Sequence, residues 1–524
     1  MGRTVADVLE EISGRTAKQV VRSLGKWPPD LFAATAAVLQ ESGAYRPLVS
    51  PPGAAVWPPS NPSVWCDEVR ELARRWVAWC DDQPALPNAP GSSPIAKRVR
   101  ALFATILGWS LEALSTEANW SQLVELLTLS AVADEACAGV GLDSTTAEGL
   151  RYRLVANDRL ADSGTLSTLP VGRIRVLPKM RTPQSGISIR SVSHHVCCIR
   201  GEVGVTWRRR DFPKRVETDR LRMLLFPWPL QVAETDFVPV EGPLKNLDTT
   251  KFGFFSFEPK YESTQLYETF DRVLRNAKDV ADPIDVVVLP ECATTEAEFE
   301  ELWRRSSLAG VHMLLAGVRG PTSNEARLRI GVADPTSVFQ HKHHRWCLEE
   351  SQIKNYDIGS SLSPSRRWWE SMNLPPRELT FVAFNEWLTL CHLICEDLAR
   401  IDPVAQVIRA VGPTLLVALL LDGPQLGHRW SARYASVLAD DPGTSVLTVT
   451  ALGMALRGSR PNRTIGFWRD AKNDGKPLVL ADDAEAAVLT VWAERLEEFT
   501  ADGRTDHGLA GRIVYGGLMQ VRGA

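Results

Sequence analysis

The chain has 524 residues, of which 44% are hydrophobic and 23% are charged, and its formal net charge is -4. At roughly 100–200 residues per domain, this length predicts two or three domains with sizeable cores. The near balance of charges disfavours a general attraction to nucleic acid or to an acidic membrane surface.

The cysteines and the apolar runs indicate the compartment. The nine cysteines are not spaced as in a small disulfide-rich secreted domain, which favours a reduced, intracellular setting. The first residues, MGRTVADVLEEISGR, carry acidic side chains where a signal peptide needs an apolar core. The longest apolar run, LLVALLL at 415–421, is much shorter than the ~20 residues that span a bilayer. We therefore expect a cytoplasmic protein with no membrane partner.

Residues 1–150 are predicted to form a helical domain. Proline-rich stretches at 51–62 and 84–94 are predicted loops, because proline cannot continue a helix interior. Outside these loops, apolar residues recur at the i, i+3, i+4, i+7 spacing of one helix face. These residues are Val5, Val8, Leu9 and Ile12, then Trp65, Val69, Leu72, Trp76 and Trp79, then Val99, Leu102, Phe103 and Ile106.

Residues 151–221 are predicted to form a small β-rich segment followed by a basic linker. The stretches VGRIRVLPKM and SGISIRSVSHHVCCIRGEVGVTW are short, β-branched and interrupted by turn residues. A basic run follows, which could contact phosphates but is better interpreted as a solvated linker with salt bridges to Asp211, Glu217 and Asp219. Its cations are Arg208, Arg209, Arg210, Lys214, Arg215, Arg220 and Arg222.

Residues 222–500 alternate between predicted strands and helices, which is typical of an α/β domain. The run IDVVVLP (284–290) is continuously apolar, as in a strand that is covered on both faces. Further strands are predicted at 311–317, 328–334, 387–395, 414–421, 445–452 and 486–493, with a helix near 428–439 and an NDG turn at 473–475. Residues 501–524 are expected to form a C-terminal tail.

Three reactive side chains follow predicted strands. Glu291 comes directly after VVVLP, Lys342 lies in FQHKHHRW just past a strand, and Cys395 ends WLTLCHLIC. The carboxyl ends of strands in an open α/β sheet converge on one crevice, so these residues can meet in space. Cys391, in the same strand as Cys395, is predicted to lie in the core.

These residue types suit hydrolysis of an amide or a nitrile. A carboxylate can take the proton of a thiol, which is a weak nucleophile until it is deprotonated. Attack pushes negative charge onto oxygen or nitrogen, which a lysine ammonium and a backbone N–H can stabilise. The N–H of Glu396, directly after the cysteine, is the natural second donor.

The segments VVVLPE (286–291), FQHKHH (339–344) and LICEDL (393–398) resemble the three signature segments of the nitrilase superfamily, in the same order. The resemblance covers roughly residues 222–495. It implies an α-β-β-α sandwich, a homo-oligomer, and a triad of Glu291 as base, Lys342 as oxyanion-binding cation and Cys395 as nucleophile. It also implies a second glutamate shortly after the lysine that helps to position substrate; Glu350 is our assignment and Glu349 is the alternative.

The resemblance further implies a thiol hydrolase that cleaves a non-peptide C–N bond of a small molecule, with neither a metal nor an organic cofactor. Glu396-Asp397 after the cysteine resembles the glutaminase domains of glutamine-dependent NAD synthetases, but we expect no synthetase domain to follow. Metal binding by His341, His343 and His344 is disfavoured, because adjacent residues of a strand do not point the same way.

The helical half leaves a second class of function open. The segment VLPKMRTPQSGISIRSVSHH resembles sequence found beside nitrilase domains in prokaryotic antiviral proteins. The helical domain would then bind a nucleotide signal or a protein partner and regulate the hydrolase as an antiviral effector. Alternatively, the nitrilase-like domain is a sensor or assembly scaffold that mainly binds a ligand or partner.

Overall fold

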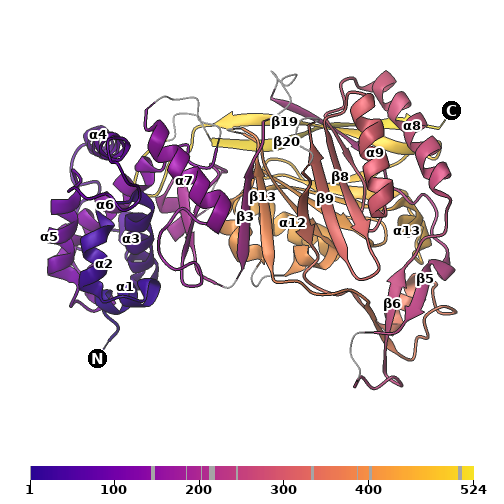
Figure 1. Ribbon diagram of the computed structural model, residues 1–524, viewed down its shortest axis with the longest axis horizontal. Helices are drawn as coiled ribbons and strands as arrows, with labels where there is room; N and C mark the ends of the chain where they lie inside the picture. The colour runs from indigo at the N-terminus through magenta and orange to yellow at the C-terminus, as the bar shows by residue number, and fades with distance from the viewer. Residues whose placement is uncertain are drawn as a thin grey trace.

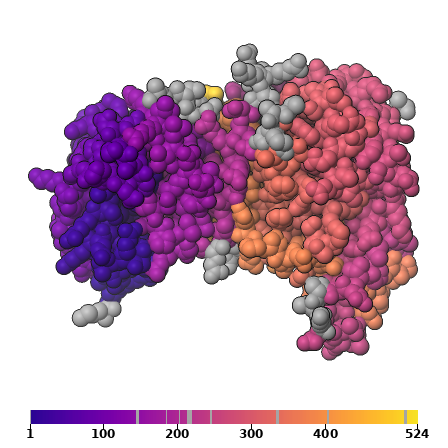
Figure 2. Space-filling model, viewed as in Figure 1, coloured from indigo at the N-terminus to yellow at the C-terminus, as the bar shows by residue number. Residues whose placement is uncertain are grey.

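The computed structural model describes residues 2–142, 148–183, 186–201, 203–211, 219–242, 246–331, 336–385, 387–400, 404–505 and 510–523. Lys214, Arg215 and Glu217 of the predicted basic linker lie outside these residues. Among the described residues, no helix has both the length and the apolar character needed to cross a bilayer. Figure 2 shows the helical half of the chain gathered at one end of the molecule and the C-terminal half at the other.

The first half of the chain is helical, as predicted. Helix α3 and helix α6 pack against each other and are buried on most of their surface, because apolar residues occupy most of their positions. The helices are α1 (Val5–Ser13), α2 (Ala17–Leu24), α3 (Pro28–Ser42), α4 (Pro62–Asp81), α5 (Ala96–Ile106), α6 (Trp120–Ala136) and α7 (Leu150–Ser163). Helix α7 therefore runs into the segment that was expected to be β-rich from residue 151.

The β-rich segment is shorter than predicted and is divided between two sheets. Strands β1 (Arg175–Pro178) and β2 (Val196–Ile199) form a small antiparallel pair. The intervening Ile189–Val192 forms a 3-10 turn where the β-branched pattern predicts a strand. Strand β3 (Gly204–Arg209) pairs in parallel with β13 and so forms the edge of a sheet in the C-terminal half.

The C-terminal half consists of two seven-stranded sheets packed face to face. The first sheet has the order β10-β9-β8-β7-β4-β19-β20, and the second has the order β18-β17-β16-β15-β14-β13-β3. Alternate residues of β7 and of its extension pack on opposite faces. Val286 and Val288 belong to the large core between the sheets, whereas Val287 and Leu289 belong to the core under α8 and α9. This period of two is expected for a strand that is covered on both faces.

Helices cover the outer faces of both sheets, which completes the α-β-β-α layers that the resemblance implies (Figure 1). The helices are α8 (Ser263–Val280), α9 (Glu296–Leu308), α10 (Glu350–Asn355), α11 (Gln406–Val411), α12 (Trp430–Asp440) and α13 (Leu452–Arg457). Strands of the first sheet are β4 (Arg220–Leu225), β7 (Val286–Val288), β8 (Met313–Arg319), β9 (Asn324–Ile330), β10 (Val338–His341), β19 (Ala484–Leu496) and β20 (Ala510–Arg522).

The second sheet contains β3 with β13 (Glu378–Ala383), β14 (Thr389–Ile394), β15 (Leu415–Leu420), β16 (Ser445–Thr450), β17 (Thr464–Arg469) and β18 (Lys476–Val479). The NDG turn joins β17 to β18, as predicted. A four-stranded sheet at one end consists of β5 (Phe237–Val240), β6 (Phe252–Phe257), β11 (Cys347–Leu348) and β12 (Arg367–Glu370), in the order β11-β12-β6-β5.

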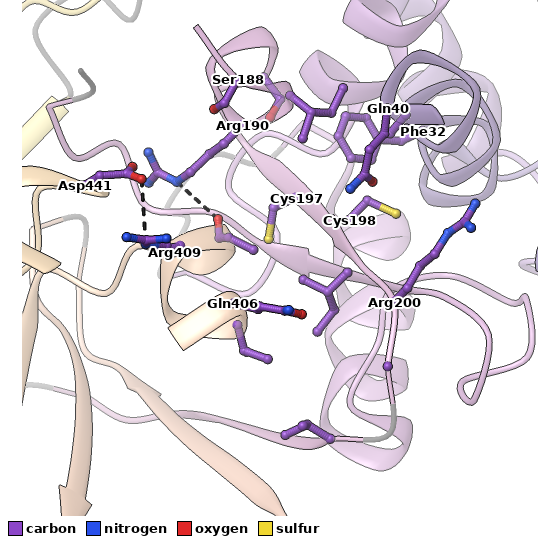
Figure 3. Close-up of a pocket in the computed structure, with 18 residues that line it drawn as sticks. Phe32, Gln40, Ser188, Arg190, Cys197, Cys198, Arg200, Gln406, Arg409 and Asp441 are labelled. Carbon is purple, nitrogen blue, oxygen red and sulfur yellow. Dashed lines mark hydrogen bonds and ion pairs between the residues drawn. The ribbon is translucent and has the colours of Figure 1, made fainter. Parts of the chain in front are cut away.

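The prediction that residues 501–524 form a tail is wrong. Strand β20 pairs antiparallel with β19 along its whole length and forms the edge of the first sheet. This long hairpin reaches from the sandwich toward the helical half (Figure 1). Near the same junction, a cavity lies where α3, β2 and α11 meet (Figure 3).

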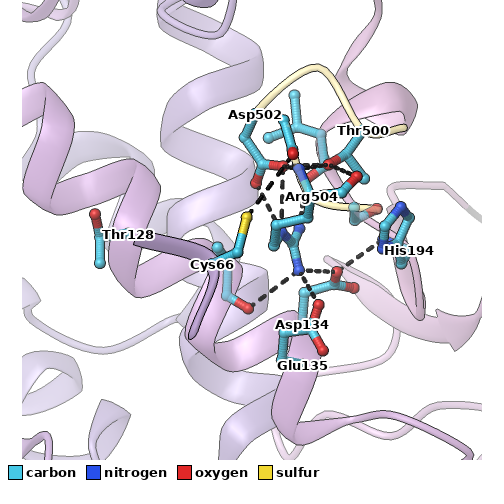
Figure 4. A network of polar contacts seen from close by, with 12 residues as sticks. Cys66, Thr128, Asp134, Glu135, His194, Thr500, Asp502 and Arg504 are labelled. Carbon is cyan, nitrogen blue, oxygen red and sulfur yellow. Dashed lines mark hydrogen bonds and ion pairs between the residues drawn. The ribbon is translucent and has the colours of Figure 1, made fainter. Parts of the chain in front are cut away.

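The turn of this hairpin is anchored in the helical half by a buried arginine (Figure 4). Arg504 is fully buried, and its guanidinium lies 3.0 Å from Asp134, 2.8 Å from Glu135 and 3.0 Å from Asp502. Asp134 also accepts the backbone N–H groups of His194, His195 and Val196 at 2.7–3.0 Å. One ionic cluster thus joins α6, the start of β2 and the C-terminal hairpin.

Replacing Arg504 should weaken this junction strongly. Arg504→Met leaves three carboxylates without their shared cation. We therefore expect the free energy of unfolding, measured in urea, to fall by about 3–5 kcal/mol. Arg74→Met is the matched control, because Arg74 is 60% exposed and its ion pair with Glu71 lies on the surface; its effect should stay within about 1 kcal/mol. Equal stability of Arg504→Met and wild type in urea denaturation would contradict a structural role for the cluster.

Candidate active site

Glu291 follows β7 of the first sheet and contacts the end of a strand in the second sheet. Its side chain is fully buried. A Cβ atom on Gly317 of β8 would lie 2.4 Å from the Cα of Glu291, so glycine is needed there for the backbone to pass. Oε2 of Glu291 accepts the N–H of Leu421 at the end of β15, at 2.6 Å. The carboxylate is therefore held from both sheets.

Lys342 follows β10 and points at two carboxylates. Its backbone N–H donates to the carbonyl of Asn324 at 3.0 Å. Its Nζ lies 2.7 Å from Oε1 of Glu291 and 2.5 Å from Oε2 of Glu370, and its side chain is only 1% exposed. The structure thus brings together two of the three residues that the sequence predicts for the triad.

The second carboxylate is Glu370, at the end of β12. Asn324 Nδ2 connects it to Glu291, because this amide donates to Oε1 of Glu370 at 2.6 Å and to Oε1 of Glu291 at 2.8 Å. An ammonium and an amide therefore lie between the two carboxylates, which fixes all four side chains.

The assignment of Glu350 as this second glutamate is wrong. Glu350 is the first residue of α10, its side chain is 64% exposed, and it pairs with Lys354 one helical turn away. The alternative, Glu349, is 53% exposed and pairs with Arg367. Glu349 and Glu350 lie on the exposed side of this segment, whereas Gln352, Asn355 and Tyr356, which follow them, line the cavity at Cys395.

Cys395 stands at the point where β14 ends and a 3-10 turn, Cys395–Ala399, begins. Its φ is +45°, a conformation that non-glycine residues rarely adopt and that commonly marks a functional turn. The thiol is 3% exposed and lines a cavity of about 540 Å³. The N–H of Leu421, which binds Glu291, also lies close enough to this thiol to lower its pKa.

A second thiol, that of Cys292, lies on the other side of the carboxylates. Cys292 also has a positive φ, +54°, and its Sγ lies within 4.8 Å of carboxylate oxygens of Glu291 and Glu370. Burial, and then these two carboxylates, raise the pKa of Cys292 well above its usual value. Unlike Cys395, Cys292 does not line the 540 Å³ cavity. The two thiols therefore differ in whether they line this cavity.

The pKa shifts describe a site with a protonated lysine and a neutral thiol. Burial alone would lower the pKa of Lys342, but the carboxylates of Glu291 and Glu370 raise it well above its usual value. Burial and then the charge of Glu291 raise the pKa of Cys395 well above its usual value, and Lys342 opposes them. Burial also raises the pKa of Glu291, against Lys342 and with a contribution from Glu370.

Asp397 joins the lysine loop to the cysteine turn. Its carboxylate accepts the backbone N–H of His343 at 2.9 Å and lies 2.7 Å from Nδ1 of His344. Asp397 is fully buried, so this contact fixes the two loops relative to each other. Two histidines of the HKHH segment therefore have a structural role, which their spacing did not reveal.

The cavity in front of Cys395 has aromatic walls and charged residues at its mouth. Asp422 at its base accepts hydrogen bonds from Tyr356, Arg429 and Trp430. Glu396, predicted to contact substrate, lines the cavity and pairs through its side chain with Arg400. The remaining lining residues are Trp346, Gln352, Asn355, Ala399, Leu421, His428, Arg433 and Tyr434.

Glu370, Asn324 and Asp397 were missed by sequence reasoning. Asn324 opens β9 and Glu370 ends β12, and neither stands in a segment that resembles a known motif. The one feature of the sequence that could have indicated Asn324 and Glu370 is that each is a polar residue at one end of a strand, and many surface residues share that feature.

Comparison with protein-family models finds no match, and neither does comparison with curated proteins. Among solved structures, the chain is similar to a glutamine-dependent NAD+ synthetase from Acinetobacter baumannii, with 11% identity and a TM-score of 0.31, over 57% of this chain and 48% of that one. The chain spans about half the length of that synthetase.

Two further structures are similar over most of their own length. A carbon-nitrogen hydrolase from Helicobacter pylori has 10% identity and a TM-score of 0.29, over 55% of this chain and 87% of that one. Nit3 of Saccharomyces cerevisiae, a member of branch 10 of the nitrilase superfamily, has 11% identity and a TM-score of 0.28, over 57% of this chain and 90% of that one.

Proposed function

We propose that the chain is a thiol-dependent hydrolase that cleaves the C–N bond of a small-molecule amide or nitrile through a covalent adduct on Cys395. The observation that carries the proposal is the buried ammonium of Lys342, held between the carboxylates of Glu291 and Glu370 and near enough to interact electrostatically with Cys395, which lines a cavity. A thiol, a carboxylate and a fixed cation are the groups that acyl transfer from an amide requires.

The first step is attack by the sulfur of Cys395 on the carbonyl or nitrile carbon. Burial and the charge of Glu291 keep this thiol protonated at rest, so its proton must leave as the new bond forms. Glu291 is the acceptor, because burial raises the pKa of its carboxylate and makes it a stronger base than an exposed glutamate. The N–H of Leu421, near both groups, favours the thiolate.

Attack places negative charge on the oxygen or nitrogen of the reacting group. Lys342 supplies a cation that is already oriented by two carboxylates, so little reorganisation is needed when that charge develops. The N–H of Glu396, next to the nucleophile, is the second donor. With an amide, Glu291 then gives its proton to the departing amine as the tetrahedral adduct collapses to a thioester, and water releases the acid and restores the thiol. With a nitrile, Glu291 instead gives this proton to the nitrogen, which yields a thioimidate; water then adds to the carbon and ammonia leaves, which gives the same kind of thioester.

Glu370 acts through its neighbours in this scheme. It fixes Lys342 and, through Asn324, the orientation of Glu291. Its negative charge also contributes to the raised pKa of Glu291. Glu370 is therefore a positioning residue that adjusts the strength of the base.

Replacing each cysteine in turn should show which of the two thiols of the site is the nucleophile. We expect Cys395→Ala to lower turnover by on the order of a thousandfold or more and to abolish the covalent adduct. Cys292→Ala, the matched control, should keep activity of the same order, because Cys292 does not reach the cavity. A metabolite extract incubated with each purified protein, analysed by mass spectrometry, identifies the consumed compound and any adduct. Consumption by Cys395→Ala that equals wild type would refute the assignment.

The pH dependence tests Glu370. Glu291 works as a carboxylate, so the rate should fall as the pH drops through the pKa of Glu291, which lies above the ordinary glutamate range. Glu370→Gln removes a charge that raises this pKa, so the acid limb of kcat/KM should move to lower pH. Glu350→Gln should leave the limb in place, because Glu350 is on the surface. An acid limb that is unchanged or moves upward in Glu370→Gln would contradict the positioning role.

A further inference from the structure

The cavity in front of Cys395 has a positively charged mouth at the start of α12. Cys395 and Asp422 are buried at its base, whereas His428 and Arg433 are exposed. Arg429 directly precedes the first residue of α12 and also lines the cavity. The N–H groups at the start of a helix carry partial positive charge, so the backbone adds to the charge of the arginines. A molecule that enters this cavity therefore passes a region of positive potential.

Arg433 is a cation of this mouth that has no carboxylate of its own. Within the described part of the chain, no carboxylate lies within ion-pair distance of it. The two carboxylates that line the cavity pair with other arginines, Asp422 with Arg429 and Glu396 with Arg400. No acidic residue stands three or four positions from Arg433 in the sequence, so its own helix offers it no partner. The mouth therefore has an excess of one positive charge.

Arg429 supplies a second guanidinium, which is fixed in place. Its Nη2 donates to Asp422 and, at 3.4 Å, to the hydroxyl of Tyr356. Its Nε is buried without a partner, whereas Nη1 takes part in neither bond and is not closed off from solvent. The N–H of Arg433 donates to the carbonyl of Arg429 at 3.3 Å, so the two side chains start one helical turn apart on the same face. One anion can therefore contact both arginines.

The reacting end of the cavity has the opposite charge. Near Cys395, the carboxylates of Glu291 and Glu370 share the single ammonium of Lys342. Burial and then the charges of Glu291 and Asp422 raise the pKa of the Cys395 thiol, so both of these carboxylates act on the sulfur. An acidic group next to the reacting carbon would be repelled by them. A substrate anion is therefore favoured only at the mouth, away from the reacting carbon.

The charge and the walls define the rest of the substrate. An excess of one positive charge matches a carboxylate better than a phosphate monoester, which carries about 1.5–2 negative charges at neutral pH. The volume of about 540 Å³ is within the range of small-molecule sites. The aromatic side chains of its walls suit an apolar body, and they are those of Trp346, Tyr356, Trp430 and Tyr434.

We propose that the substrate carries a carboxylate at the end remote from the amide or nitrile, and that this carboxylate accepts hydrogen bonds from Arg433 and from Nη1 of Arg429. The inference rests on the proposed function, since it names the class of amide or nitrile that Cys395 attacks. Arg433 is then a residue that determines specificity, because it contacts the substrate far from the reacting carbon.

The test compares three amides with one aromatic body: 4-carboxyphenylacetamide, 4-methylphenylacetamide and 4-(aminomethyl)phenylacetamide. Each is titrated calorimetrically into the full-length Cys395→Ala variant, so that binding is measured without turnover. The carboxylate should bind about tenfold or more tightly than the methyl compound, as expected for a charge-assisted hydrogen bond, and the ammonium compound should bind most weakly. Equal affinities of the three, tighter binding of the ammonium compound, or no binding of the carboxylate at millimolar concentration would overturn the proposal.

Ammonia release by the wild-type protein separates this inference from the proposed reaction. A kcat/KM that is highest for the carboxylate supports both. Equal kcat/KM for the carboxylate and the methyl compound would overturn the specificity and leave the reaction standing. Tighter binding of the carboxylate to Cys395→Ala, with no ammonia released from it by wild type, would support the anion site and count against the reaction.

A reversal of charge locates the anion. Arg433→Glu, made in the Cys395→Ala protein, should weaken binding of the carboxylate about fivefold or more and strengthen binding of the ammonium compound, because an attraction becomes a repulsion. Arg74→Glu in the same protein is the matched control; Arg74 is 60% exposed and belongs to the helical half, so the order of affinities should not change. Affinities in Arg433→Glu that match those of its parent would overturn the proposal.

Discussion

The candidate site depends on one buried ammonium held between a buried carboxylate, Glu291, and a partly buried one, Glu370. Lys342 lies within hydrogen-bond distance of both Glu291 and Glu370, and Asn324 bridges the same pair. The two carboxylates raise the pKa of Lys342 well above its usual value although burial lowers it, so the charge of the ammonium depends on both of them. The nearby thiol of Cys395 stays protonated until a base takes its proton, because burial and then the charge of Glu291 raise its pKa, against the effect of Lys342.

The sandwich fold brings these residues together from distant parts of the chain. Glu291 and Lys342 come from strands of the first sheet, Cys395 from the second sheet, and Glu370 from the small sheet at one end. Contacts across the layers then fix the loops: Leu421 binds Glu291, and Asp397 binds the lysine loop. Because the site residues come from different sheets, groups that no single strand could place side by side lie close enough to exchange protons.

Much of this arrangement could be predicted from the sequence, for identifiable reasons. Helix periodicity and continuous apolar runs revealed the helical half and the central strands, because burial imposes those patterns locally. Glu291, Lys342 and Cys395 were predicted as a triad because each stands in a short motif at the end of a strand, and the structure places Glu291 and Lys342 in contact. Glu370 and Asn324 were missed, and Glu350 was chosen wrongly, because their contacts depend on how sheets pack. Strand β20 was taken for a tail, since glycines interrupt its β pattern.

The most direct test of the central claim is a crystal structure of the protein with a simple aldehyde such as butyraldehyde. The thiol of Cys395 should add to the aldehyde carbon, and its proton should pass to the aldehyde oxygen, giving a thiohemiacetal that resembles the first intermediate. The account predicts that this oxygen lies about 3 Å from Nζ of Lys342. An adduct on Cys292 instead, or an oxygen on Cys395 directed away from that ammonium, would contradict it.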